Sequence, residues 1–296
     1  MQDVIVIGGG IAGMAAALQL ARARRSVLVI DANMPRNRFA AHAQGFLTQD
    51  GVPPDQLAAR GKADLMRYPT ARWHMGEVVA VSGGKDAFTV TLAAGTVFQA
   101  RRVILALGVC DLLPDIPGLE ERWGGTVAHC PYCHGYEMGG GRIAVIAGGP
   151  ETLHHLPLFA DWGHVTLLTN GMVAVSADQR RTLAAQRIDI ESTLIERIEG
   201  EADIRLADGR WLRFAGIFVA PRVEPASDLG RTLGLETVTT QMGTQVQTDA
   251  MKETSTAGVY ACGDVARMPH SLSLAMADGA WAGACVHRSL VFDPVV

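Results

Sequence analysis

The sequence predicts an α/β protein made of two similar three-layer units. Three observations support this prediction. A β-branched run near the N-terminus ends in a glycine-rich turn that opens a helical stretch. The same order of elements recurs near the middle of the chain, and each copy is followed by short strands that Gly-containing turns separate. Each copy therefore has the pattern of a Rossmann-like nucleotide-binding domain with a β-meander.

The first copy begins with a strand pattern at residues 3–7 (DVIVI), and the segment GGGIAG follows it. This segment is a Gly-x-Gly-x-x-Gly motif that precedes a helical stretch. We expect Gly8 to form a tight turn, Gly10 to let the backbone approach a pyrophosphate, and Gly13 to pack the helix against the strand. The phosphates would lie at the helix N-terminus, where free N–H groups and the helix dipole favour negative charge. The expected cofactor-binding residues of this turn are Gly8, Gly10, Ile11, Ala12 and Gly13.

The next strand pattern, residues 26–30 (SVLVI), ends at Asp31. An acidic residue at this place in a dinucleotide-binding motif accepts hydrogen bonds from a ribose. Asp31 is therefore predicted to bind an adenosine ribose. Because the strands, the helix and the acid are all present, a nucleotide site is a better interpretation than an ordinary glycine-rich turn.

The second copy departs from the motif. Residues 142–146 (RIAVI) lead into AGGPET at residues 147–152 and a helical stretch. Ala147 stands at the place of the turn glycine, and Thr152 at the place of the packing residue. The following strand pattern ends in Thr-Asn-Gly at residues 169–171, with neither an acid nor an arginine. We therefore expect a degraded nucleotide motif here.

Short predicted strands follow each copy. After the first they lie at residues 78–81, 88–92 and 102–108, with turns at Gly83-Gly84 and Gly95. After the second they lie at residues 194–198, 204–206 and 217–220, with a turn at Asp208-Gly209. A further strand, at residues 258–264 (GVYACGD), ends in Gly-Asp and precedes a long apolar segment at residues 271–290.

Length and composition fit a two-domain globular protein that binds small ligands. The chain has 296 residues, of which 48% are hydrophobic and 19% charged, and its net charge is -4. Without a basic run, nucleic acid is not expected as a partner, and no polybasic membrane signal is present. The N-terminal MQDVIVIGGG lacks the pattern of a signal peptide, and no apolar run is long enough for a membrane span, so a cytoplasmic location is expected.

Five cysteines are present, and two of them belong to the segment AHCPYCHGYE at residues 128–137. An odd count in a reducing cytoplasm does not suit a structural disulfide framework. The segment allows three interpretations: a haem attachment site, half of a zinc site completed by distant histidines, or a redox dithiol. The other cysteines, which stand in apolar patterns and are expected to be small core residues, are Cys110, Cys262 and Cys285.

With this order of parts, the chain resembles the thioredoxin-reductase-like group of FAD-dependent pyridine nucleotide-disulfide oxidoreductases. The resemblance covers almost the whole chain and rests on residues 8–13, 130–137 and 259–264. It implies that the second domain is inserted in the first. The implied boundaries are an FAD-binding domain at residues 1–112 and 223–296, and a NAD(P)H-domain-like insert at residues 113–222.

The resemblance also implies further flavin contacts. Asp264, preceded by Gly263, is similar to the family residue that binds the ribityl chain. The N-terminus of the helix that starts near Ser271 would face the pyrimidine end of the isoalloxazine. Asn37, in a polar loop at residues 36–46, is expected to contact the flavin or line the substrate entrance. His270, which lies where relatives place an Arg-Gln pair, is a candidate second acid or base.

Among the three interpretations of the cysteine segment, the resemblance favours the redox dithiol. It implies that Cys133 is the sulfur that faces the flavin and that Cys130 exchanges with the substrate. His134 takes the place of an acidic proton donor in ordinary thioredoxin reductases, and a histidine can serve as general acid or base near neutral pH. His129 could assist. No metal site is expected, and zinc ranks far below the dithiol because only one cysteine pair is present.

The segment CPYCHGYE and the degraded second motif are similar to the gliotoxin- and holomycin-type dithiol oxidase branch of the family. Because the basic cluster that pairs with the 2′-phosphate is missing, NADPH is expected to bind poorly. The leading hypothesis is therefore an FAD-dependent enzyme that oxidises a small dithiol with O2. The alternatives are an NAD(P)H-dependent reductase of thioredoxin-like proteins or disulfides, and a non-enzymatic flavin-binding or metal-sensing module. Relatives are usually homodimers, so the resemblance implies a homodimer.

Overall fold

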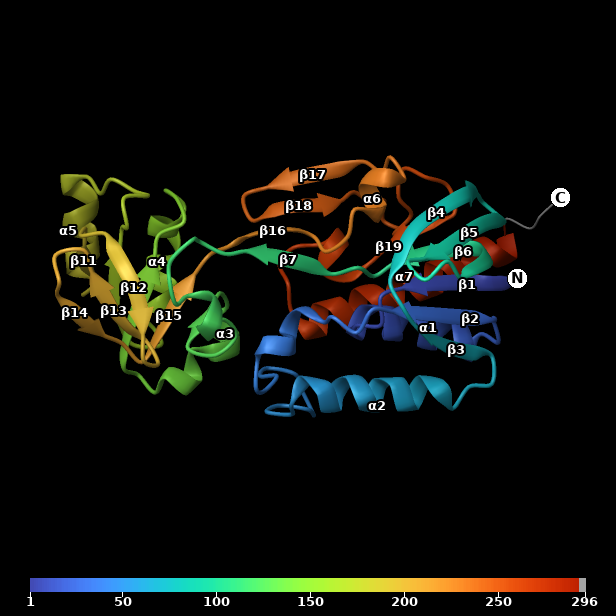
Figure 1. Ribbon diagram of the computed structural model, residues 1–296, viewed down its shortest axis with the longest axis horizontal. Helices are drawn as coiled ribbons and strands as arrows, with labels where there is room; N and C mark the ends of the chain where they lie inside the picture. The colour runs from blue at the N-terminus through green and yellow to red at the C-terminus, as the bar shows by residue number, and fades with distance from the viewer. Residues whose placement is uncertain (293–296) are drawn as a thin grey trace. The chain divides into compact units, whose positions relative to one another are not determined.

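The computed structural model describes residues 1–292, which form two compact units (Figure 1). The first unit, drawn in blue, teal, orange and red, contains Met1–Arg36, Asp55–Cys110 and residues 223–292. The second unit, mostly green and yellow, contains Asn37–Pro54 and Asp111–Arg222. The predicted fold class, α/β with two Rossmann-like units, is confirmed. The segment at residues 37–54, which the predicted boundaries place in the FAD-binding domain, belongs to the second unit.

The first unit is built on a mixed sheet of seven strands. Its order is β3-β2-β1-β6-β5-β4, and β19 also pairs with β6. The first three strands, β6 and β19 run parallel, whereas β4, β5 and β6 form the antiparallel meander. The strands are β1 (Gln2–Ile7), β2 (Val27–Asp31), β3 (Ala71–Met75), β4 (Val78–Gly84), β5 (Ala87–Leu92), β6 (Val97–Leu105) and β19 (Val259–Ala261).

This topology brings three loops of the first unit to one edge of the sheet. Strands β1, β2 and β19 are parallel to one another through β6, so their carboxyl ends lie at the same edge. The residues that follow these ends are Gly8 after β1, Asp31 at the end of β2, and Gly263 after β19. Residues predicted from three distant parts of the sequence therefore meet where ligands bind in open α/β sheets.

The two faces of the sheet are covered separately. Val4 and Val6 face a core with helices α1 (Ile11–Arg22) and α7 (Leu272–Phe292), whereas Ile5 and Ile7 face the meander. The helices α1 and α7 touch through their backbones, because a Cβ on Gly279 would lie 2.0 Å from the carbonyl oxygen of Ala12. The unit also contains α2 (Pro54–Met66), α6 (Leu229–Thr232), η4 (Gly263–Ala266) and a second sheet of β17 (Thr237–Thr240), β18 (Gly243–Val246), β16 (Arg222–Pro225) and β7 (Val109–Leu112).

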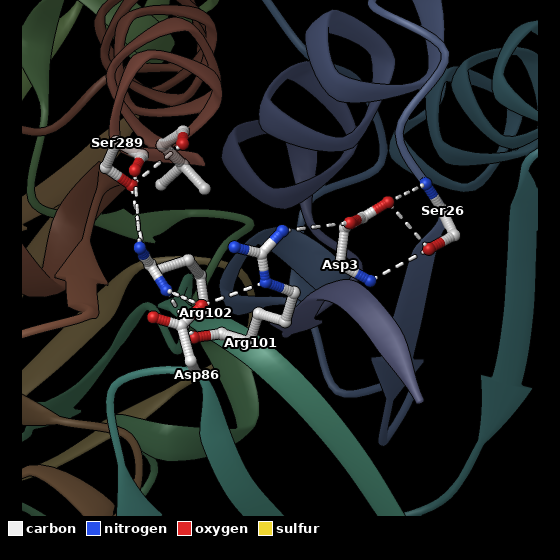
Figure 2. Close-up of polar contacts among 7 residues, drawn as sticks. Asp3, Ser26, Asp86, Arg101, Arg102 and Ser289 are labelled. Atoms are coloured by element: carbon white, nitrogen blue, oxygen red, sulfur yellow. Dashed lines mark hydrogen bonds and ion pairs between the residues drawn. The ribbon is translucent and has the colours of Figure 1, made fainter. Parts of the chain in front are cut away.

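A buried arginine ties the C-terminal helix to the meander (Figure 2). The guanidinium of Arg102 is fully buried; it donates to Ser289 Oγ of α7 at 3.1 Å and to Asp86 Oδ1 at 2.8 Å. Asp86 also accepts from Arg101 at 2.9 Å. Although desolvation opposes it, these hydrogen bonds hold the pKa of Asp86 below its ordinary value. The buried charge is thus paired, as burial requires.

The second unit repeats the plan with a purely parallel sheet. The order is β11-β10-β9-β15-β8, and an antiparallel meander of β12, β13 and β14 accompanies it. The strands are β8 (Val127–Ala128), β9 (Arg142–Ile146), β10 (His164–Leu168), β11 (Asp189–Glu191), β12 (Ile195–Glu199), β13 (Asp203–Leu206), β14 (Trp211–Arg213) and β15 (Gly216–Val219). The helices are η1 (Arg36–Phe39, at the boundary of the two units), η2 (Glu120–Arg122), α3 (Pro131–His134), η3 (Tyr136–Met138), α4 (Thr152–Phe159) and α5 (Ala177–Ala185).

Two sequence predictions about this fold are wrong. Gly83 and Gly84 do not form a turn, since they pair with Phe88 and Ala87 as the end of β4; the turn lies one step later, where Asp86 has a φ of 70°. Cys110 is exposed rather than buried, because it alternates with the buried Val109 on the short strand β7. Cys262 and Cys285 are buried, as predicted.

Within residues 1–292, no helix is long and apolar enough to cross a membrane.

Candidate functional site

The glycine-rich turn of the first unit leaves open space at one glycine only. Gly8 has a φ of 107°, and a Cβ there would lie 2.2 Å from the carbonyl oxygen of Ala106. A Cβ on Gly13 would lie 1.9 Å from the carbonyl oxygen of Gly8, so these two positions are required by packing. At Gly10, by contrast, a Cβ would meet nothing within 4 Å. Gly10 therefore opens onto unfilled space at the N-terminus of α1, where a phosphate is favoured.

The carboxylate of Asp31 is fixed beside this turn. Its Oδ1 accepts hydrogen bonds from the backbone N–H of Gly9 at 3.1 Å and of Asn33 at 3.2 Å. A Cβ on Gly9 would collide with this carboxylate at 2.6 Å. Asp31 is thus held at the end of β2 next to the glycine-rich turn, where the sequence predicts a ribose contact.

Asp264 carries the clearest sign of a missing hydrogen-bond partner. Its Oδ2 accepts from Arg36 Nη1 at 3.3 Å, but its Oδ1 is buried and has no partner within the described part of the chain. A buried carboxylate oxygen without a donor is costly, so a hydroxyl-bearing ligand would satisfy it. The turn before it is held by Asp278, which accepts from the N–H of Gly263 at 2.9 Å and pairs with Lys252 at 3.1 Å.

Arg36 and His270 complete this corner of the first unit. Nη1 of Arg36 lies 2.8 Å from Nδ1 of His270. Because a guanidinium can only donate, Nδ1 accepts and Nε2 carries the proton in the neutral ring. The hydroxyl of Ser271 accepts from the N–H of Leu274 at 3.2 Å and caps α7. His270, Ser271 and a loop that begins at residue 36 are predicted from the sequence to lie near the flavin, but the pairing of Arg36 with Asp264 is not, because most of the chain separates the two residues.

These features fit a flavin dinucleotide. The open turn at Gly10 would take the pyrophosphate, Asp31 the adenosine ribose, and Asp264 Oδ1 a ribityl hydroxyl. All three lie in the first unit, at the carboxyl edge of its parallel strands. Asn37 lies in η1, and its carbonyl accepts from the N–H of Ala40; its predicted flavin contact stays a prediction.

The cysteine segment lies in the second unit and contains a disulfide. Cys130 and Cys133 are bonded, with Cα atoms 5.3 Å apart, and Cys130 is the N-cap of α3 with Pro131 at its first helical position. The expected pairing of these cysteines is therefore present. In the described residues, no group of three or more His, Cys, Asp or Glu side chains could hold a metal ion.

His134 follows the disulfide directly and is half-buried. Burial lowers its pKa below the ordinary 6.5, although the backbones of Cys130 and Gly124 and the charge of Glu137 oppose this effect. Its Nδ1 is buried and makes no hydrogen bond of regular geometry within the described chain. The imidazole is therefore neutral at pH 7 and able to take a proton. His129, on the other side of the pair, stacks on Trp123 with ring centres 5.8 Å apart.

The glycine-rich loop of the second unit is filled by its own side chains. The N–H of Gly148 donates to Thr152 Oγ1 at 3.2 Å, and Thr152 is buried. A Cβ on Gly149 would lie 2.6 Å from the carboxylate of Glu151, which therefore lies against the loop backbone. At the end of β10, Asn170 Oδ1 accepts from the N–H of Ile195. The sequence shows that Thr152 departs from the motif, but only the structure shows that its hydroxyl bonds to the loop.

Residues 2–279 match the family described as pyridine nucleotide-disulphide oxidoreductase. The chain belongs to this family. Among curated relatives, thioredoxin reductase sirT of Leptosphaeria maculans is 32% identical over 306 residues, which cover 96% of this chain and 93% of the relative. Thioredoxin reductase aclD of Aspergillus oryzae is 32% identical over 309 residues, which cover 98% and 97%.

Solved structures agree with this membership. An oxidoreductase from Agrobacterium tumefaciens is 48% identical with a TM-score of 0.96, and the match covers 99% of each chain. The crystal structure of HlmI is 37% identical with a TM-score of 0.91, covering 99% of this chain and 93% of that one. The protein is thus a flavoprotein oxidoreductase of the thioredoxin-reductase-like type.

Proposed function

We propose that the protein is an FAD-dependent thiol-disulfide oxidoreductase that oxidises a small dithiol with O2 as electron acceptor. The observation that carries this direction of electron flow is the filled loop of the second unit. The N–H of Gly148 already bonds to Thr152, and the carboxylate of Glu151 lies against Gly149. A nicotinamide dinucleotide would have to displace both in order to place its pyrophosphate there.

The main cost of that displacement is the hydrogen bond to the buried Thr152, since the exposed Glu151 side chain can swing aside. A pyrophosphate on a helix N-terminus depends on free N–H donors, and each charge-assisted hydrogen bond contributes about 1.5–3 kcal/mol. The Glu151 carboxylate adds like-charge repulsion close to the phosphate position. Electrons therefore enter the protein from a thiol substrate in our proposal, and NAD(P)H binds weakly.

The thiol chemistry is carried by the cysteine pair. One thiolate of the substrate attacks Sγ of Cys130, the Cys130–Cys133 bond breaks, and Cys133 leaves as a thiolate. The second substrate thiolate then attacks the substrate sulfur of this mixed disulfide, which forms the substrate disulfide and releases Cys130. Two electrons pass from the substrate to the cysteine pair. The two protons of the substrate thiols go to the cysteine thiolates, to a nearby base or to water.

His134 is the base in this scheme. Because its lowered pKa keeps the ring neutral at pH 7, it can take the proton of the attacking substrate thiol or return one to a departing thiolate. Bound FAD would accept the two electrons of the reduced cysteine pair and pass them to O2, which leaves as H2O2 with two protons. Asp264, Asp31 and the turn at Gly10 would hold the FAD.

A second candidate is an NAD(P)H-dependent reductase of thioredoxin or another disulfide. The names of the curated relatives, which call both sirT and aclD thioredoxin reductases, favour it. In that case the loop at Gly148 would have to open for the nicotinamide nucleotide, and electrons would leave through the same cysteine pair.

Anaerobic mixing of the FAD-loaded protein with NADPH, NADH or dithiothreitol separates the two candidates. We expect dithiothreitol to bleach the flavin and both nicotinamide nucleotides to leave it oxidised, with H2O2 formed once air is admitted. Cys133→Ser should abolish the bleaching, while Cys110→Ser, at the exposed cysteine of β7, serves as the matched control. Rapid bleaching by NADPH in the wild-type protein would reject the oxidase and support the reductase.

A further inference from the structure

Two large aromatic side chains beside the disulfide are exposed. Tyr132 is 71% exposed and Tyr136 is 87% exposed. Single exposed apolar side chains are common on proteins, but two neighbouring rings beside a reactive disulfide form a patch that needs a reason. The thiol chemistry described above does not use either ring.

Backbone geometry places the two rings on one side of the turn. The helix α3 ends at His134, but Gly135 keeps the right-handed helical conformation and leads directly into η3. Tyr132 and Tyr136 are therefore four residues apart along continuous helical backbone, and Tyr136 is three residues from Cys133. Both rings thus lie on the face that borders Cys133.

Trp162 supports this face from behind. Its ring meets that of Tyr132 edge-to-face, with centres 5.1 Å apart and an angle of 85° between planes. A Cβ on Gly135 would lie 2.5 Å from Cδ1 of the indole, so the turn rests directly on Trp162. Because the ring of Tyr132 is held by an indole that the turn itself contacts, it is an ordered surface, which lowers the entropy cost of binding.

The segment around the disulfide carries almost no charge. From residue 126 to residue 141 it contains no Lys or Arg, and Glu137 is its only acid. Nothing in this segment would pair with an anionic substrate or with the carboxylates of an acidic protein surface. Two phenol rings with an indole behind them favour a flat, uncharged, apolar molecule.

We propose that Tyr132 and Tyr136, supported by Trp162, are the specificity-determining platform that binds the substrate dithiol, and that this substrate is small, uncharged and carries an aromatic or other planar apolar face. The inference rests on the proposed function and adds the substrate class to it. Each ring should raise the affinity for an aromatic dithiol by roughly three- to tenfold.

The test compares two dithiols that differ in apolar surface. Anaerobic flavin reduction is followed against the concentration of 1,2-benzenedimethanethiol and of dithiothreitol, for the wild type, Tyr132→Ala, Tyr136→Ala and the corresponding Phe variants. Trp211→Ala removes another exposed aromatic ring of the second unit, on the distant meander strand β14, and is the matched control.

We expect each Ala variant to raise the half-saturating concentration of the aromatic dithiol by about threefold to tenfold. The limiting rate should fall much less, the loss for dithiothreitol should stay within about twofold, and the Phe variants should recover most of the aromatic preference, since the ring face is kept. Equal losses for both dithiols, or an effect of Trp211→Ala as large as that of the tyrosine variants, would overturn the platform.

A second measurement keeps this result separate from the proposed function. Binding of the cyclic disulfide of 1,2-benzenedimethanethiol is followed by protein fluorescence, which requires no turnover. Binding that Tyr132→Ala and Tyr136→Ala weaken supports the platform even if neither dithiol reduces the flavin, an outcome that rejects only the oxidase. Binding that is absent in the wild type, or unchanged in both variants, rejects the platform.

Discussion

The two glycine-rich loops of this protein lie at equivalent places in their units, but only the second is in contact with the side chains of Thr152 and Glu151. Both follow a parallel strand of a Rossmann-like unit, β1 in the first and β9 in the second, and precede a helix. In the first, Gly10 opens onto empty space, whereas in the second the N–H of Gly148 is bonded to Thr152 and the Glu151 carboxylate lies against Gly149. The comparison teaches that the fold persists when two side chains of the protein lie against the glycine-rich loop.

The difference also separates packing glycines from binding glycines. Gly8 and Gly13 of the first loop are needed by the backbone itself, since a Cβ at either would strike a carbonyl oxygen. The second unit has Ala147 and Thr152 at the matching places, and its sheet forms nonetheless. The loop geometry has therefore adjusted to larger residues, and Thr152 supplies the hydrogen bond that a ligand phosphate would otherwise make.

The largest expected effect comes from placing a side chain at Gly10, in the open space of the first loop. Gly10 has an extended backbone with φ of -66°, and its Cβ position is empty, so Gly10→Val should leave the apoprotein folded. We expect it to weaken FAD binding at least about hundredfold, equivalent to about 2.8 kcal/mol, because the methyl groups would occupy the phosphate space. Equilibrium titration of apoprotein with FAD measures this.

The matched control for that change is Gly149→Ala in the second loop. Its Cβ would meet only the end of the flexible Glu151 side chain, which can swing away. FAD affinity and dithiol-driven flavin reduction should both stay at the wild-type level. If Gly149→Ala impaired flavin binding as strongly as Gly10→Val, the assignment of the FAD site to the first loop would be wrong.

An effect of about the same size should follow from changing the base beside the disulfide. Since burial lowers the pKa of His134, its neutral form dominates above pH 6.5, and the rate of flavin reduction by a dithiol should fall only as pH drops below that value. His134→Gln should slow reduction about hundredfold at pH 7 and remove this acidic limb. Stopped-flow rates from pH 5 to 8 give both results.

Replacement of His155, an exposed histidine on α4, by Gln is the control for the pH profile. It should keep both the rate and the acidic limb. A limb that persists unchanged in His134→Gln would show that another group controls the proton transfer.

The smallest expected effect comes from removing the two side chains that contact the second loop. Thr152→Ala frees the N–H of Gly148, and Glu151→Ala removes the carboxylate from the loop. The double variant should bind NADH about tenfold more tightly than the wild type, because a donor is gained and like-charge repulsion is lost. Titration of nucleotide fluorescence tests this; wild-type binding that already equals that of the double variant would contradict the self-filled loop.

Local patterns predicted several candidate site residues. The turn at Gly8–Gly13 and the acid at Asp31 follow from spacing within a short segment. The spacing of Cys130 and Cys133 also allowed a haem or zinc site, and the resemblance to a family favoured the disulfide pair that the structure contains. The hairpin at Asp86 was misplaced because glycines are compatible with a strand end as well as a turn. Cys110 was misplaced because an apolar neighbourhood in sequence does not tell which way a short strand faces.

The amino-acid sequence by itself determined the two-unit α/β plan and the glycine-rich turn of the first unit, since each depends on residues close together in the chain, whereas the spacing of the cysteine pair left a haem site, a zinc site and a redox dithiol open until the resemblance to a family favoured the dithiol. Only the tertiary structure decided that Arg36 meets Asp264 and His270, that Thr152 and Glu151 close the second loop, and that Trp162 supports Tyr132. The physical reason is that such contacts depend on how strands and helices pack, and small differences in side-chain direction decide whether two groups meet.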